Sequence, residues 1–190
     1  MVKDIQVKNF ATYKKYLKSL IGEESLMRLL DSLGGDEKVM NASFGMTKNS
    51  GTAYDGAMVE LSLEIGRYTS AINDLLPEGK RVEPSKIYKV ALLSHVSKVV
   101  MYQENLNEWE KQNRGILYTF TNREIMLKGG ELSTLICMNC GIKFEDDEFE
   151  AMRILDKLKE EGTNCIWGSS TLAMIIRQAN EIISNIRREA

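Results

Sequence analysis

Cysteine, histidine and long apolar stretches are all scarce in this sequence. Three cysteines, Cys137, Cys140 and Cys165, are few and odd in number, which argues against a disulfide framework and suits a reducing cytoplasm. No apolar run approaches the roughly 20 residues that span a bilayer, and none follows a basic start, so we expect neither membrane insertion nor secretion. The single histidine, His95, leaves little imidazole for a metal centre. We therefore expect a cytoplasmic protein.

An excess of positive charge is also missing. The chain has 25 Lys and Arg residues against 27 Asp and Glu residues, for a formal net charge of -2. Its basic residues are scattered among acidic ones, so nucleic-acid binding has little electrostatic support. Hydrophobic residues make up 43% and charged residues 27% of the 190 positions, close to the globular average. This length and composition predict one folded domain over residues 1–190.

The apolar pattern has mainly helical periodicity. Two short helices are expected within residues 7–33, because Gly34 and Gly35 end the pattern as a C-terminal cap would. Further helices are predicted at residues 55–76, 85–98, 131–140, 147–160 and 170–188. Residues 41–52 read as a loop. Strand-forming residues at 99–103 and 116–121 flank a polar stretch at 104–115 and predict a β-hairpin with a long tip. The expected fold is mainly α with one β-hairpin.

Two segments resemble motifs of a known enzyme family. Residues 53–63, AYDGAMVELSL, are similar to AYEGGLLEHSL, in which the histidine is a metal ligand. Leu61 stands at that position here. Residues 91–98, ALLSHVSK, are similar to ALLHDICK, whose adjacent His and Asp are replaced by Ser94 and His95.

Three later segments continue the resemblance in the same order. After a hairpin with Trp109, residues 127–133 are similar to a stretch ending GHGEKS, with Gly129 at a histidine position. AMRIL at residues 151–155 resembles AIRWH, with Leu155 for the histidine. Residues 172–183 resemble LALLLHQADELA, with Asn180 for a metal-binding Asp.

Together these segments are similar to the HD-type phosphohydrolases of phages and prophages. The resemblance covers residues 26–186 and leaves 1–25 as an N-terminal helical extension. It implies an HD-like helical bundle in which His and Asp side chains would hold divalent metals that activate water and polarise a phosphoryl group. Because the ligand positions hold other residues, we expect no metal, no cofactor and no HD-type catalysis. The resemblance implies a pseudoenzyme of phage or prophage origin, in the host cytoplasm, that binds a protein partner or a small ligand.

Several individual residues have both a structural and a functional interpretation. His95 could act as a base, but a partly buried histidine hydrogen-bonded to a neighbour is favoured. Lys98 could serve a phosphate in the former cleft, but a cap at its helix end is favoured. Cys137 and Cys140 form a lone CxxC, which predicts buried thiols rather than half of a zinc site. The acidic run at residues 146–148 suits a helix N-terminus and needs no metal.

Two other function classes stay open. One is a nucleotide phosphohydrolase with a rebuilt site, drawn from Asp55, Glu60, Glu64, Asp156 and His95. Glu60 and Glu64 share a helix face at i and i+4, where carboxylates are usually just solvated. The other class is a virion-associated structural protein. Homo-oligomerisation stays open as well.

The hairpin tip is the expected partner surface. Leu106 and Trp109 stand among charged residues on the long tip, and an exposed aromatic there would anchor a protein partner. Alternatively, Trp109 folds back and covers the core.

Overall fold

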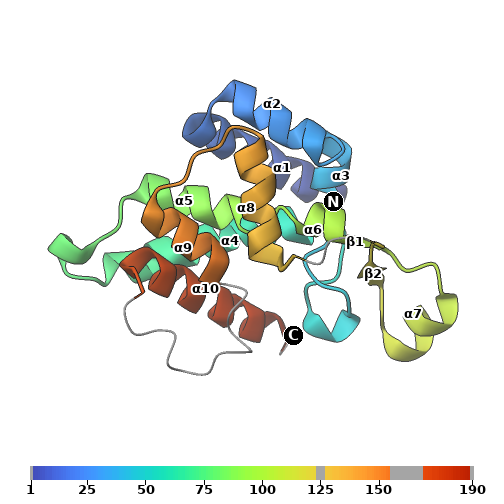
Figure 1. Ribbon diagram of the computed structural model, residues 1–190. Helices are drawn as coiled ribbons and strands as arrows, with labels where there is room; N and C mark the ends of the chain where they lie inside the picture. Colours follow the sequence, from blue (N-terminus) through green and yellow to red (C-terminus); the bar gives the residue numbers. More distant parts are fainter. Residues whose placement is uncertain (1, 123–126, 155–168, 189–190) are drawn as a thin grey trace.

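The computed structural model describes residues 2–122, 127–154 and 169–188. Over these residues the protein is mainly helical with a two-stranded antiparallel hairpin, which confirms the predicted fold class (Figure 1). None of the described helices combines the length and apolarity needed to cross a membrane. The elements in chain order are α1 (Val2–Ile21), α2 (Glu23–Ser32), α3 (Asp36–Met40), the 3-10 helix η1 (Lys48–Ser50), α4 (Ala57–Asp74), the 3-10 helix η2 (Glu78–Lys80), α5 (Pro84–Leu93), α6 (Lys98–Met101), β1 (Tyr102–Glu104), α7 (Glu108–Arg114), β2 (Tyr118–Phe120), α8 (Gly129–Asn139), α9 (Asp146–Ile154) and α10 (Thr171–Arg188).

Helix α4 occupies the centre of the helical body and packs against α1, α5 and α10. It is buried along much of its length, as expected for a helix with neighbours on several sides. Gly66 allows close approach of α5, because an added Cβ would lie 2.9 Å from the ring of Tyr88. Helix α9 packs on α10, α8 and α5. The core therefore joins segments from both halves of the chain.

The helix predicted at residues 85–98 ends earlier than expected. Helix α5 stops at Leu93, residues 94–97 form a turn, and Lys98 begins the short helix α6. A hydroxyl from another helix stabilises the turn, because the backbone N–H of Ser97 donates to Oγ of Ser133 at 3.0 Å. The prediction of one continuous helix was wrong here, and so was the prediction of a strand at residues 99–101.

The predicted hairpin is present, with shorter strands. Strand β1 pairs with β2 in a register that places Glu104 opposite Tyr118. Its tip contains helix α7, which the sequence analysis did not predict. The Asn107 side chain caps this helix by accepting hydrogen bonds from the N–H groups of Trp109 and Glu110 at 3.1 and 3.3 Å. In Figure 1 the hairpin projects from the helical body and carries α7 at its far end.

The segment at residues 41–52, predicted to be a loop, connects the hairpin to the end of α10. Thr47 forms a β-bridge with Ile116, and the N–H of Lys48 donates to the carbonyl of Gly115 at 2.8 Å. Gly51 has a φ of 64° and lies so close to α10 that an added Cβ would collide with the carbonyl oxygen of Arg187. The base of the hairpin and the last turn of α10 are thus in one packed unit.

Candidate functional site

The positions that align with metal ligands in the HD-like motifs fall on elements that meet in the helical body. Helix α5 contacts α4, α8 and α10, and α4 contacts α10. The positions are Leu61 on α4, Ser94 and His95 in the turn after α5, Gly129 at the start of α8 and Asn180 on α10. Leu155 lies outside the described residues, as do Asp156 and Cys165.

Leu61 is fully buried and belongs to the apolar core. An isobutyl side chain at this place offers no lone pair to a metal and excludes water from its surroundings. Ser94 is also buried, and its hydroxyl donates to the carbonyl of Ala91 at 3.4 Å. The Leu61 side chain is therefore part of the packed core, and the Ser94 hydroxyl is bonded within its own turn of the chain.

His95 is buried beside an aromatic ring. Burial, followed by the positive charge of Lys98, holds its pKa well below the usual value, so the imidazole is neutral. Its ring contacts Phe44 edge-on, with centroids 4.6 Å apart. Within the described parts of the chain, Nε2 has no hydrogen-bond partner. The expected burial is found, and the expected hydrogen bond is not made through Nε2.

Lys98 occupies a different place from the one predicted. It begins α6 rather than ending α5, and its ammonium lies 4.4 Å from the centroid of Phe44 and 5.1 Å from that of Tyr102. The Tyr102 hydroxyl is 3.5 Å from the same nitrogen. Two aromatic faces therefore hold this cation next to the His95 turn.

Two further polar atoms are buried without a partner among the described residues. They are Oδ1 of Asn180, one of the positions selected by the resemblance, and Oγ of Ser97, which the sequence analysis did not single out. Each such atom costs about 1 to 3 kcal/mol relative to a bonded one. Among the described residues, this region is thus a mainly apolar interior with a few unpaired polar atoms.

The carboxylates of the alternative, rebuilt site are engaged by a basic residue of α10. Arg187 donates to Glu60 and to Glu64, at 2.8 Å each. The Tyr54 hydroxyl donates to the same oxygen of Glu60 at 3.0 Å, and burial together with the Glu60 charge raises the pKa of Tyr54. The expectation of freely solvated carboxylates was therefore wrong. Their ion pairs tie α4 to α10.

Asp55 lies apart from this group, beside the hairpin. The Tyr118 hydroxyl donates to its carboxylate at 2.6 Å, which joins the segment before α4 to strand β2. An open cleft of about 380 Å³ lies between that segment, the hairpin and α7. Of the described residues proposed for a rebuilt site, Asp55 alone lines this cleft.

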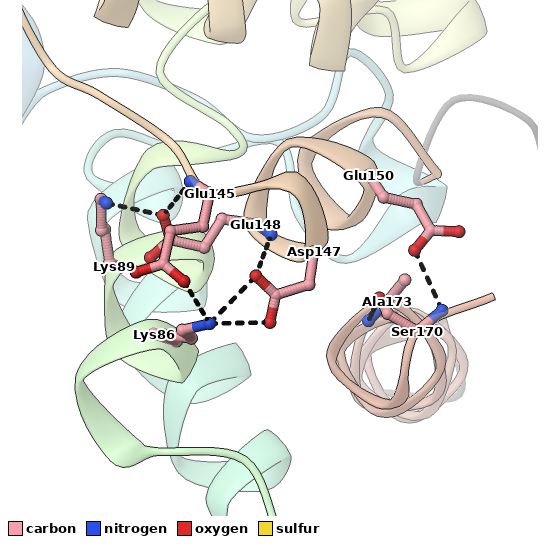
Figure 2. Close-up of polar contacts among 8 residues, drawn as sticks. All are labelled: Lys86, Lys89, Glu145, Asp147, Glu148, Glu150, Ser170 and Ala173. Atoms are coloured by element: carbon pink, nitrogen blue, oxygen red, sulfur yellow. Dashed lines mark hydrogen bonds and ion pairs between the residues drawn. The ribbon is translucent and has the colours of Figure 1, made fainter.

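The acidic run at residues 146–148 forms the first turn of α9, as predicted. Figure 2 shows that Asp147 and Glu148 face two lysines of α5. Lys89 pairs with Glu148 at 2.7 Å, and Lys86 contacts Asp147 at 3.0 Å and Glu145 at 2.7 Å. Glu148 is almost fully buried and also accepts the N–H of Glu145 at 2.8 Å, as in a capping box. This cluster fixes α9 on α5.

A second carboxylate from α9 reaches the start of α10. Glu150 accepts the backbone N–H of Ser170 at 2.9 Å, and Oγ of Ser170 accepts the N–H of Ala173 at 3.3 Å (Figure 2). These contacts cap α10. A hollow of about 400 Å³, lined by Lys86, Asp147 and the first residues of α10, lies beside them.

The paired cysteines are packed thiols, as predicted. Cys137 and Cys140 are buried and reduced, and burial raises the pKa of Cys137. The Cys140 thiol donates to Oγ of Ser32 at 3.5 Å, which joins α8 to α2. Across the described residues, no group of three or more His, Cys, Asp or Glu side chains is placed to hold a metal ion.

The hairpin tip exposes its apolar side chains. Leu106 is 87% exposed and Trp109 is 62% exposed, so the interpretation in which Trp109 covers the core was wrong. The tip beneath them is held by Asn105, whose side chain donates to Glu110 and to the carbonyl of Ile116, both at 2.9 Å, and accepts the N–H of Asn107 at 3.0 Å. An ordered scaffold thus presents two solvent-exposed apolar groups.

Comparisons with protein-family models, with curated proteins and with solved structures found nothing that matches this chain.

Proposed function

We propose that this chain is a catalytically inactive HD-like protein of phage or prophage type, which binds a protein partner through its hairpin. The observation that carries the proposal is the hairpin tip, where Leu106 and Trp109 are exposed on an internally hydrogen-bonded projection. Aromatic and aliphatic anchors of this kind supply much of the binding energy at protein interfaces. The proposed setting is the cytoplasm of the bacterial host.

The order of the elements supports the HD-like part of the proposal. The five segments that resemble HD motifs lie at the start of α4, at the end of α5, before and within α8, at the end of α9 and along α10. Helices α4, α5 and α10 contact one another. Leu61 fills a ligand position with buried apolar volume, and Ser94 bonds to its own helix. These features favour a scaffold retained without its metal chemistry.

The hydrogen bonding of the tip supports the binding part. Asn105 and Asn107 fix the chain on both sides of Leu106, and Lys48 ties Gly115 to the body of the protein. A loop that is already ordered loses less conformational entropy when it binds. The rebuilt enzyme site has less support, because the carboxylates of Glu60 and Glu64 are already engaged in ion pairs with Arg187.

Quantitative co-purification from the phage host tests the proposal. Leu106→Ala and Trp109→Ala should each reduce recovery of a specific partner at least about tenfold, which corresponds to a loss of about 1.4 kcal/mol in binding. Leu75→Ala and Met27→Ala are matched controls, since these residues are 85% and 60% exposed on other helices. The same partners at the same yield in all four variants would refute the hairpin as the binding surface.

The location of the partner separates a free regulator from a virion component. Recovery of the chain with purified particles, dependent on Trp109, would assign the same surface to particle assembly. Recovery only from the soluble fraction of infected cells would support the regulator.

A further inference from the structure

The cleft at the base of the hairpin has the chemistry of a cation site. It has a volume of about 380 Å³, within the range of small-ligand sites, and is lined by Tyr54, Asp55, Glu104, Lys111, Leu117 and Tyr118. Two tyrosines and a leucine form the aromatic and apolar part of the cleft wall, and the other three side chains named here are charged. All of these residues belong to the segment before α4, the hairpin or α7.

The charge of the cleft is negative despite its lysine. Lys111 is bound by Glu104 and Glu108, at 2.9 Å each, so its single positive charge is outweighed by two carboxylates. These hydrogen bonds raise the pKa of Lys111 and keep it protonated. Asp55 adds a second uncompensated negative charge, because no cation of the described residues lies within ion-pair distance of it. A positively charged ligand is therefore favoured.

Asp55 is already oriented for such a ligand. The Tyr118 hydroxyl occupies Oδ1 at 2.6 Å, which fixes the carboxylate plane while Oδ2 stays available to accept further hydrogen bonds. Asp55 is exposed to solvent, so an incoming cation reaches it without a change in the core. The arrangement joins a fixed carboxylate to aromatic walls in one open cleft.

We propose that this cleft receives an arginine side chain from a partner protein. A guanidinium group is planar, stacks on aromatic rings and forms directional hydrogen bonds to carboxylates, so it suits this lining better than a compact ammonium. Its alkyl stem would pack against Leu117. That the arginine comes from a protein partner rests on the proposed function; the cation site itself rests on the cleft.

Titration of the ¹⁵N-labelled full chain with an acetylated, amidated Gly-Arg-Gly peptide tests the site. Saturable shifts are expected at the amides of Asp55, Leu117 and Tyr118. The matching citrulline peptide is neutral but nearly isosteric, and it should bind at least about tenfold more weakly. Equal binding of the two peptides, or the absence of shifts at these amides, would overturn the proposal.

Three variants assign the effect to the carboxylate. Asp55→Asn keeps an acceptor for Tyr118 but removes the charge, and should weaken the arginine peptide about tenfold or more. Asp31→Asn removes a charge from exposed α2 and should change nothing. Tyr118→Phe keeps the ring and the Asp55 charge but removes the hydrogen bond that orients the carboxylate, so binding should weaken by less than in Asp55→Asn. Retained binding in Asp55→Asn, or a larger loss in a folded Tyr118→Phe than in Asp55→Asn, would refute the assignment.

The two proposals fail separately in this design. If Trp109→Ala leaves partner recovery intact while Asp55→Asn abolishes peptide binding, the hairpin anchor fails and the cation site stands. If the peptide does not bind but Trp109→Ala loses the partner, the reverse holds.

Discussion

The helical interior around Leu61 and His95 and the hairpin tip distribute polar and apolar groups in opposite ways. In the interior, buried polar atoms of His95, Ser97 and Asn180 lack partners among the described residues, while Leu61 is fully enclosed. At the tip, buried Asn105 uses both its amide nitrogen and its oxygen, while Leu106 and Trp109 face solvent. The buried amide of Asn105 is thus fully hydrogen-bonded in the projecting hairpin tip. The exposed apolar side chains of the tip stand on this hydrogen-bonded backbone.

One substitution made in both regions should show the contrast most strongly. Leu61→Ala empties a closed site in the core and should cost about 2 to 5 kcal/mol of unfolding free energy. Leu106→Ala removes an exposed side chain and should stay within about 0.5 kcal/mol. Urea denaturation of the two variants measures both values. A cost below about 1 kcal/mol for Leu61→Ala would mean that the interior around this residue is not tightly packed.

The Asn105 network should give the next largest effect. Asn105→Ala removes three part-buried hydrogen bonds, two of them to the backbone at Asn107 and Ile116, so a loss of about 1 to 3 kcal/mol is expected. Relative to the unmodified chain, hydrogen exchange in this variant should become faster at the tip and stay unchanged in α4, because the lost hydrogen bonds are local. Asn113→Ala, which removes one exposed bond to the Trp109 carbonyl, serves as the control. Uniformly faster exchange throughout the chain would contradict a local role.

The His95 imidazole predicts a pH dependence of stability. Its folded-state pKa lies below the ordinary value of about 6.5, so below that pH the unfolded chain binds a proton that the folded chain does not. Stability should therefore be constant above about pH 7.5 and fall by up to about 1.4 kcal/mol by pH 5.5. His95→Phe should flatten this profile in denaturant titrations. An unchanged slope in that variant would assign the effect to other groups.

Nucleotides should have the smallest effect of all. Leu61 is fully buried and His95 is buried and neutral, so the region around them offers little to a phosphate. A ligand at a hundredfold excess over its Kd would stabilise the chain by about 2.7 kcal/mol, which moves a melting curve by several degrees. We expect no shift with a panel of mono-, di- and triphosphates. A reproducible rise in Tm with any of them would restore a nucleotide site.

Local patterns in the sequence were enough to predict most helices but not their ends. Apolar periodicity located α4 and α10 because each buries a long stripe against neighbours. It could not place the end of α5, which depends on the Ser133 hydroxyl 36 residues away. Helix α7 did carry a readable signal, since Asn107 precedes Glu108 and Glu110 as an N-cap precedes acidic first-turn residues.

The resemblance to HD motifs pointed to Leu61, Ser94 and His95, but not to the contacts that these residues make. Their burial depends on the packing of α4, α5 and α8. The pairing of Glu60 and Glu64 with Arg187 spans more than 120 residues, so no local pattern reports it. Ser97 was missed because a serine in a turn has no sequence signature of burial.

Because any side chain at Gly51 would collide with the backbone of Arg187, this position couples the evolution of two segments that are distant in the sequence. A saturation library there should return glycine alone among clones that fold, since every alternative pushes on the backbone at Arg187. Homologues in which the last turn of α10 changes would also have to change the segment from Thr47 to Gly51. That segment contacts the hairpin through the β-bridge between Thr47 and Ile116. Sequence change in the hairpin is thereby constrained by Gly51, a residue that lies outside the hairpin.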